Sequence, residues 1–235
     1  MSTVKRNVKQ KVTTVGTKEN ERRKRARKIG RVLEKLFPDA SIALRFGSPW
    51  ELYVAVVLSA QCTDKKVNEV TARLFKKYSR FEDYTGADPL IFAHDVRQTG
   101  FYRTKAKHIL AAAKLLDKEF DGRLPCTMEE LLRLPGVARK TANVILGNVC
   151  DVVVGIAVDT HVKRFAQKFN LSDSKDPVKI EHDLMVLFPK KEWPIITYRL
   201  IEYGRHICPA RPHDCIEHPL TRVYPPAAKI WPRAK

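Results

Sequence analysis

From residue 48 onward, the sequence repeats the pattern that begins an α-helix. Ser48 precedes a proline and, three residues later, Glu51, and together they form the capping box of a helix start. Thr127 begins a second such box, and Asp-Pro pairs at residues 88–89 and 176–177 mark two further starts. Apolar residues follow these starts at helical spacing, and no segment shows the alternation of a strand. The sequence therefore predicts an all-α fold.

One of these helices is apolar on nearly every face. Residues 52–58 read Leu-Tyr-Val-Ala-Val-Val-Leu, and a helix without a polar face is expected to be buried. The 235 residues suffice for one large domain or two modest ones, because a single core rarely grows beyond about 250 residues. We therefore expect a globular chain in which this helix is buried.

The charge balance is strongly basic. The formal net charge is +18 and the isoelectric point is near 9.8, and an excess of positive charge attracts polyanions, nucleic acid first among them. An anionic membrane is the alternative, but no segment approaches the roughly 18 consecutive apolar residues of a membrane span. The N-terminus also lacks the apolar core of a signal peptide. We therefore expect no membrane association and an intracellular protein, in the cytoplasm and nucleoid or in a nucleus.

The N-terminal segment is polar and basic. We expect residues 1–24 to form a disordered tail, because they contain too little apolar surface to pack. A tail of this charge can also bind phosphates or serve as an import signal. Ile29, Val32 and Leu33 then have the spacing of an amphipathic helix, which is expected to end near Phe37.

The five cysteines are odd in number and unevenly spaced. This pattern argues against the disulfide framework of a secreted domain. We therefore expect reduced thiols, as in a cytosol or a nucleus.

A short turn at residues 134–138, with the sequence Leu-Pro-Gly-Val-Ala, joins two expected helices. Proline ends the first helix, and Gly136 permits the positive φ of a tight reversal. The backbone amides of Val137, Ala138 and Arg139 are then expected at a helix N-terminus, where they favour an anion such as a DNA phosphate. The alternative is an ordinary connection between helices.

Lys140 comes directly after this turn, in the first turn of the second helix. The positive end of the helix dipole, with Arg139 beside it, is expected to lower the pKa of Lys140. A neutral amine is a nucleophile that can attack an anomeric carbon to give a Schiff base. The alternative is a lysine that extends into solvent.

Asp159 ends an apolar run and stands at the start of another expected helix. The amides of the first helical turn keep a carboxylate at this place ionised. Such a carboxylate can stabilise positive charge that develops on a sugar, or orient a proton transfer. A plain N-cap is the alternative, and the two roles are compatible.

The segment from residue 134 to residue 143 resembles the hairpin of the endonuclease III branch of the helix-hairpin-helix DNA glycosylases. The family pattern usually has a second glycine where this chain has Ala138. The resemblance implies that Lys140 is the Schiff-base nucleophile and that Asp159 is its carboxylate partner.

The same resemblance implies two helical domains with a DNA groove between them. A six-helix barrel that carries the hairpin is expected at residues 43–153. Residues 25–42 and 154–235 are expected to form a discontinuous domain. Lys140 and Asp159 would then face each other across the groove.

Two further segments resemble family loops that act when a damaged nucleotide is flipped out of the duplex. Residues 58–64 resemble the loop whose glutamine enters the vacated stack, which implies this role for Gln61. Residues 100–106 resemble the loop whose apolar residue wedges into the opposite strand, which implies this role for Phe101. A core aromatic at a helix start is the alternative for Phe101. Contacts to phosphates or grooves are expected from Arg103, Lys105 and His161.

In this family the C-terminal segment carries four cysteines that bind a four-iron four-sulfur cluster. Cys208 and Cys215 match the first two by spacing, but His218 and Tyr224 stand at the other two positions. Because a cubane cluster needs four thiolates or close substitutes, we predict that no iron–sulfur cluster is bound.

Three interpretations of this remnant are open. We expect that the packing of prolines and aromatic residues replaces the cofactor, so that no cofactor is bound. A zinc site made of Cys208, Cys215, His218 and either His206 or His213 is the second interpretation. A disulfide bond between Cys208 and Cys215 is the third.

These expectations combine in one mechanism, in which a nucleotide is flipped, Lys140 displaces its base and β-elimination nicks the strand. The predicted protein is a monomeric, bifunctional DNA glycosylase/AP lyase of base excision repair. Its expected partner is double-stranded DNA with damaged bases or abasic sites, and its expected substrates are oxidised pyrimidines such as thymine glycol. A glycosylase for oxidised guanine and a non-catalytic helix-hairpin-helix DNA-binding protein are the alternatives.

Overall fold

The computed structural model of this chain describes the backbone of residues 2–230 and the side chains of residues 16–230. Within these residues the regular secondary structure is helical and includes no strand, which confirms the all-α prediction. None of the helices described combines the length and the apolar character that crossing a membrane requires. The chain forms two compact units, one of Ile42–Val154 and one of Met1–Ser41 with Gly155–Lys235.

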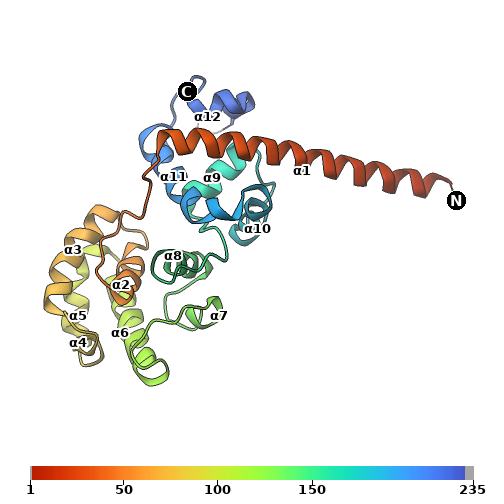
Figure 1. Cartoon of the computed structure of the whole chain (residues 1–235). Coiled ribbons are helices and arrows are strands. Elements are labelled where there is room, and N and C mark those ends of the chain that lie inside the picture. Colours follow the sequence, from red (N-terminus) through yellow and green to blue (C-terminus); the bar gives the residue numbers. More distant parts are fainter. Residues whose placement is uncertain (1, 231–235) are drawn as a thin grey trace. The chain divides into compact units, whose positions relative to one another are not determined.

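The unit Ile42–Val154 is built around one buried helix. Its elements in chain order are α2 (Pro49–Ser59), α3 (Asp64–Lys77), α4 (Glu82–Thr85), α5 (Pro89–Asp95), the 3₁₀ helix η1 (Arg97–Thr99), α6 (Tyr102–Glu119), α7 (Met128–Leu131) and α8 (Arg139–Val149) (Figure 1). All residues from 52 to 58 of α2 are buried, and α2 contacts α3, α6 and α8. The prediction that this helix is buried is therefore confirmed.

Helix α2 begins as the sequence predicts. The hydroxyl oxygen of Ser48 accepts a hydrogen bond from the amide of Glu51 at 3.2 Å. The Glu51 carboxylate in turn accepts one from the amide of Gly47 at 2.5 Å. This reciprocal pair satisfies amides that a helix start leaves without partners.

The second unit is built on α1 (Ser2–Leu36). Its other elements are α9 (Thr160–Lys168), α10 (Pro177–Leu187), the 3₁₀ helix η2 (Lys190–Glu192), α11 (Trp193–His206), α12 (Pro219–Val223) and the 3₁₀ helix η3 (Pro225–Lys229) (Figure 1). Helix α1 contacts α10, α11 and α12, and it buries Ala26, Ile29 and Leu33 completely. The predicted amphipathic helix is thus present, and it ends one residue before Phe37.

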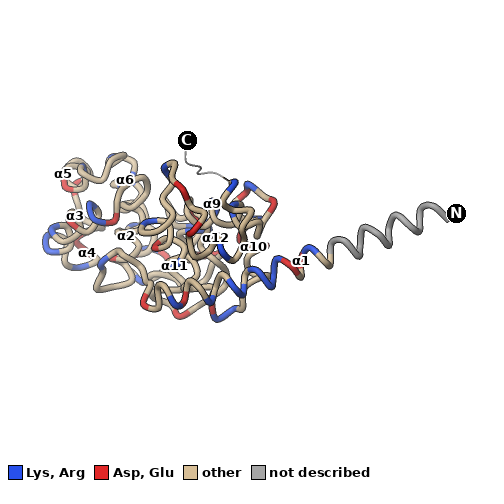
Figure 2. Tube along the Cα trace, turned by 90° about the horizontal axis from the view of Figure 1, so that it is seen from above, with Lys and Arg blue, Asp and Glu red and all other residues tan. Residues whose placement is uncertain are grey.

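The segment predicted as a disordered tail at residues 1–24 is drawn as helix from Ser2 onward, as part of α1, and Met1 lies outside the described residues. Figure 2 shows blue lysine and arginine stretches along the described part of α1. Lys18 contacts Asp173 at 2.7 Å, and Arg22 contacts the same carboxylate at 2.6 Å. The hydrogen bonds from Lys18 and then Arg22 lower the pKa of Asp173. Two basic side chains of the segment predicted as a tail therefore hold α1 against the segment after α9.

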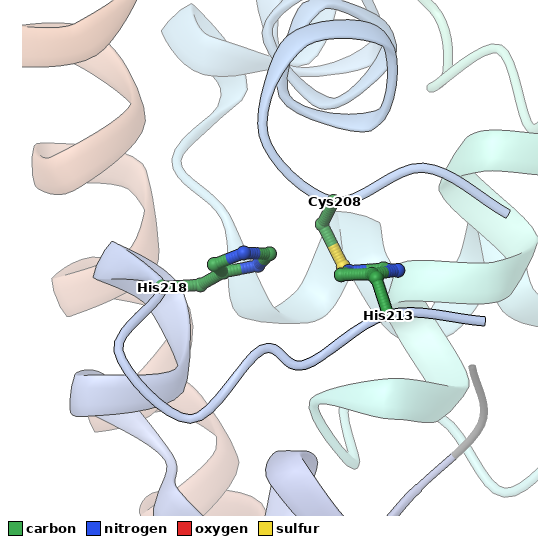
Figure 3. Close-up of side chains that lie close together, drawn as sticks. All are labelled: Cys208, His213 and His218. Carbon is green, nitrogen blue, oxygen red and sulfur yellow. The ribbon is translucent and has the colours of Figure 1, made fainter. Parts of the chain in front are cut away.

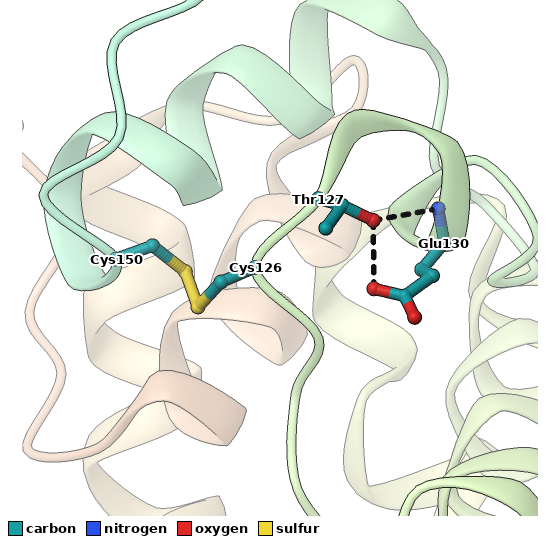
Figure 4. The surroundings of a disulfide bond; sticks show 4 residues. All are labelled: Cys126, Thr127, Glu130 and Cys150. Atoms are coloured by element: carbon teal, nitrogen blue, oxygen red, sulfur yellow. Dashed lines mark hydrogen bonds between the residues drawn. A yellow bond between two sulfur atoms is a disulfide. The ribbon is translucent and has the colours of Figure 1, made fainter.

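Cys126 and Cys150 form a disulfide bond, so the prediction of reduced thiols is wrong for this pair (Figure 4). Cys126 precedes Thr127, whose hydroxyl accepts from the Glu130 amide at 3.2 Å and donates to the Glu130 carboxylate at 2.7 Å. Cys150 is the residue that ends α8. The bridge therefore closes a loop that contains α7, the turn and α8. The remaining cysteines, Cys62, Cys208 and Cys215, are free.

Candidate active site

The turn between α7 and α8 requires a glycine at one position. Gly136 has a φ of +82°, a value that side chains strain. A Cβ atom there would also lie 3.1 Å from Nδ1 of His108 on α6. The positive φ and the close approach to α6 therefore both require a glycine at position 136. The sequence predicts the first of these two reasons.

The amides of this turn differ from the prediction at one residue. The Val137 amide donates to the carbonyl oxygen of Leu134 at 3.1 Å. It is used within the turn itself, because a reversal this tight closes its own hydrogen bond. Of the amides predicted to bind a phosphate, at Val137, Ala138 and Arg139, the Val137 amide is therefore already hydrogen-bonded within the turn.

Ala138, which stands where the family pattern usually has a glycine, is not strained. It caps α8 with a φ of −105° and a ψ of 170°, an extended conformation that any residue adopts. The replacement of glycine by alanine is therefore compatible with the hairpin.

Tyr53 was missed by the sequence analysis. It lies in α2 with no exposed surface, and its hydroxyl donates to the carbonyl oxygen of Pro135 at 2.5 Å. Burial raises the pKa of Tyr53, so the hydroxyl remains a donor. A tyrosine within an otherwise aliphatic helix was the available signal, because a buried phenol needs a hydrogen-bond partner.

Lys140 is the second residue of α8 and its side chain is exposed. It is therefore accessible to a substrate in the first turn of the helix that follows the hairpin. Arg139, which precedes it, is half-buried.

Asp159 is the N-cap of α9, as the sequence predicts. One of its oxygens accepts from the Val162 amide at 2.8 Å, and the other lies 2.9 Å from Nδ1 of His161. The Asp159 side chain keeps 17% of its surface exposed. His161, predicted as a phosphate or groove contact, therefore orients the carboxylate together with the helix cap.

Gly204 on α11 makes room for this pair. A Cβ atom at Gly204 would lie 2.5 Å from Cδ2 of His161 and 3.0 Å from Nη2 of Arg164. Only glycine therefore permits the His161 ring to lie where it contacts Asp159. No sequence signal identifies this residue, since the contact joins two separate helices.

Gln61 and Phe101 both have positive φ, at 53° and 48°. Such values are uncommon in residues with side chains, and they concentrate at functional sites. Both side chains are exposed, Phe101 by 67%. The alternative that Phe101 is a core aromatic is therefore excluded.

The position of Lys105 contradicts the prediction that this residue contacts a phosphate or a groove. Only 4% of its surface is exposed, and burial lowers the pKa of its ammonium. The ammonium donates to the carbonyl oxygens of Leu58 at 2.8 Å and Thr99 at 2.7 Å. Because Leu58 is the first residue of the segment that contains Gln61, and Thr99 precedes the segment that contains Phe101, Lys105 connects the two segments.

Arg103, predicted as a phosphate or groove contact, is accessible for such a contact. Its side chain is exposed, and its guanidinium lies 5.6 Å from the centre of the Tyr102 ring. The structure thus groups Gln61, Phe101 and Lys140 in the unit Ile42–Val154. It groups Asp159 and His161 in the other unit.

The C-terminal loop does not supply the donors of an iron–sulfur cluster. Cys208 and Cys215 are buried thiols, and His218 caps α12. The ring of Tyr224 lies 3.9 Å below the guanidinium of Arg25, so it packs against α1. With two thiolates in place of four, these residues do not fit a cubane.

The helical fold with its hairpin is that of the DNA glycosylases of base excision repair. A family model described as the HhH-GPD superfamily of base excision DNA repair proteins matches residues 54–190. Endonuclease III of Synechocystis sp. is 44% identical over 206 residues, which cover 88% of this chain and 94% of the relative. Endonuclease III of Bacillus subtilis is 44% identical over 79% of this chain and 84% of the relative.

A solved structure supports the same grouping. The structure of a trapped endonuclease III–DNA covalent intermediate matches this chain with a TM-score of 0.83 and 39% sequence identity, over 88% of this chain and 97% of that one. The chain therefore belongs to the endonuclease III family within the HhH-GPD superfamily.

Proposed function

We propose that this enzyme removes oxidised pyrimidines, thymine glycol among them, from double-stranded DNA and then cleaves the strand at the resulting abasic site. The amine of Lys140 bonds to the anomeric carbon while the glycosidic bond breaks, and the base leaves with the bonding electrons and takes up a proton. The sugar ring then opens, because the ring oxygen leaves the anomeric carbon with the bonding electrons and takes up a proton, and the resulting iminium makes the neighbouring sugar proton acidic. Loss of that proton and departure of the 3′ phosphate complete a β-elimination.

The observation that carries this proposal is the exposed Lys140 in the first turn of α8, directly after the hairpin. An exposed amine at this place is free to attack an anomeric carbon in its neutral form. A solved relative is an endonuclease III trapped in a covalent intermediate with DNA, and covalent chemistry with DNA is what we propose for this chain.

Asp159 acts on the same reaction. Its carboxylate is held by the Val162 amide and by His161, so its orientation is set before substrate arrives. We propose that it stabilises the positive charge on the sugar as the base departs and orients the proton transfers that release Lys140.

DNA is the polyanion that the net charge of +18 attracts, and a non-covalent endonuclease III–DNA complex is among the solved relatives. In our proposal Gln61 enters the space left by the flipped nucleotide, and Phe101 stacks on bases of the opposite strand. The enzyme acts as a monomer on genomic DNA within the cell.

Borohydride trapping tests the nucleophile. With a duplex that contains thymine glycol, the wild-type chain should form a covalent protein–DNA adduct, and Lys140→Ala should form none. Lys107→Ala is the matched control, because Lys107 is an exposed lysine of α6 in the same unit. Normal trapping by Lys140→Ala would show that another amine carries the reaction.

The substrate class is tested with duplexes that each contain one defined lesion. We expect turnover of thymine glycol to exceed that of 8-oxoguanine, and a plain abasic site to be cleaved. Preference for 8-oxoguanine would replace the substrate assignment and leave Lys140 in place. Binding without turnover of any lesion would identify a non-catalytic DNA-binding protein.

A further inference from the structure

Three potential metal ligands meet in the loop between α11 and α12. Cys208, His213 and His218 each offer one donor atom, and these atoms lie within 4.8 Å of one another. Figure 3 shows the three side chains turned toward each other from the end of α11 and from the loop that leads to α12. Ligands around one zinc ion are separated by about 3 to 4 Å, since zinc bonds are about 2.0 to 2.3 Å long. Small side-chain movements would therefore close the site.

Each of the two imidazoles has one buried ring nitrogen without a hydrogen-bond partner among the described residues. Nδ1 of His213 lies 2.7 Å from the carbonyl oxygen of Arg211, so it carries the proton and Nε2 does not. Nε2 of His213 and Nδ1 of His218 are both buried, and neither has a hydrogen-bond partner among the described residues. Buried polar atoms are normally satisfied. A metal ion would satisfy both, and a backbone carbonyl on the other ring nitrogen is the usual support of a ligating histidine.

Cys215 lies in the same loop but outside this group of three donor atoms, so its side chain would have to approach them to serve as the fourth ligand. Its sulfur is buried and accepts a hydrogen bond from the ammonium of Lys168 at 3.2 Å. Lys168 is itself 1% exposed and is held by the carbonyl oxygens of Ala227 and Ile230, each at 3.0 Å. The ammonium of Lys168 therefore holds the sulfur of Cys215 at a fixed place in this loop.

We propose that Cys208, His213, Cys215 and His218 bind one zinc ion. Two thiolates and two neutral imidazoles form a standard tetrahedral donor set for zinc, whereas a cubane needs four thiolates or close substitutes. All four donors come from one loop of residues 208–218, so the ion pins the connection between α11 and α12. This structural zinc replaces the packing interpretation, because packing alone leaves two buried imidazole nitrogens without partners.

Metal analysis of the full-length wild-type chain is the first test. After expression with both zinc and iron supplied and purification without chelators, we expect about one zinc ion per chain and no stoichiometric iron. Replacement of zinc by cobalt should give the visible bands of a tetrahedral ion and a thiolate-to-cobalt charge-transfer band. Stoichiometric iron with cluster absorption, a metal-free chain, or a Cys208–Cys215 disulfide in the purified protein would each overturn the proposal.

Variants assign the ligands. His213→Ala and His218→Ala should each reduce zinc content severalfold, while His206→Ala should retain it. His206 is the matched control, because it is an exposed histidine of α11 that contacts Glu202. If both ligand variants keep their zinc, the site lies elsewhere. Should they fail to fold, the cobalt spectrum of the wild-type chain decides, because an ion without thiolate ligands shows no charge-transfer band.

Discussion

The hydroxyl of Tyr53 donates a hydrogen bond to the carbonyl oxygen of Pro135 at 2.5 Å. This bond joins the buried helix α2 to the turn that precedes Lys140. The hairpin is therefore hydrogen-bonded to the core of its own unit. The disulfide bond between Cys126 and Cys150 constrains the same hairpin covalently.

Removal of this hydroxyl should loosen the hairpin. We expect Tyr53→Phe to lower the free energy of unfolding by about 1 kcal/mol, the net value of a typical hydrogen bond, and to reduce turnover of a damaged duplex. Urea unfolding and single-turnover kinetics measure the two effects. Tyr84→Phe is the control, because Tyr84 is an equally buried tyrosine of α4. Equal activity losses in both variants would mean that the Pro135 bond has no particular role.

The loops of Gln61 and Phe101 should respond together to one substitution. Lys105→Met removes the donor to both Leu58 and Thr99 and leaves two buried carbonyl oxygens without it, at a cost of about 1 to 3 kcal/mol each. We expect lower stability in urea and reduced kcat/KM on a damaged duplex. Lys107→Met on the exposed face of α6 should change neither. Unchanged stability with weaker, less salt-dependent DNA binding would instead support the phosphate contact that the sequence suggested.

The disulfide bond should stabilise the hairpin measurably. It joins residues separated by 24 positions, and a loop of this length corresponds to about 3 kcal/mol in the chain-entropy model. Cys126→Ser should lower the free energy of unfolding by that order, and a reductant should destabilise the wild type but leave the variant unchanged. Cys62→Ser should keep the wild-type sensitivity to reductant, since Cys62 is free. A wild type indifferent to reductant would show that the pair is not bonded in solution.

Gly204 should be essential for the position of His161. In Gly204→Ala the new methyl group would meet the His161 ring at 2.5 Å, and overpacking of this kind costs about 1 to 3 kcal/mol. If His161 positions Asp159, kcat should fall on the order of tenfold to a hundredfold. Gly147→Ala in α8, which has no atom within 4 Å of the added carbon, should be neutral or slightly stabilising. Full activity of Gly204→Ala would separate His161 from the reaction.

Much of the fold is readable from local patterns. Ser48, Asp159 and the apolar residues 52–58 each signal a helix start or a buried helix, because caps and helical periodicity depend on residues only a few positions apart. Gly136 was predictable for the same reason. Lys105 was not, since a lysine is normally expected at the surface, and only the folded chain shows the two carbonyl oxygens that compensate its burial.

By itself, the sequence determined the helical class, the hairpin with Lys140 and the cap at Asp159, all of which depend on short-range geometry. The tertiary structure decided which residues that are far apart in the chain contact each other. It formed the disulfide bond between Cys126 and Cys150 and the ion pair between Arg22 and Asp173. It also packed Gly204 against His161, and it placed His213 and His218 close to Cys208. These contacts depend on how whole helices pack, because packing brings together side chains whose separation in the chain carries no local signal.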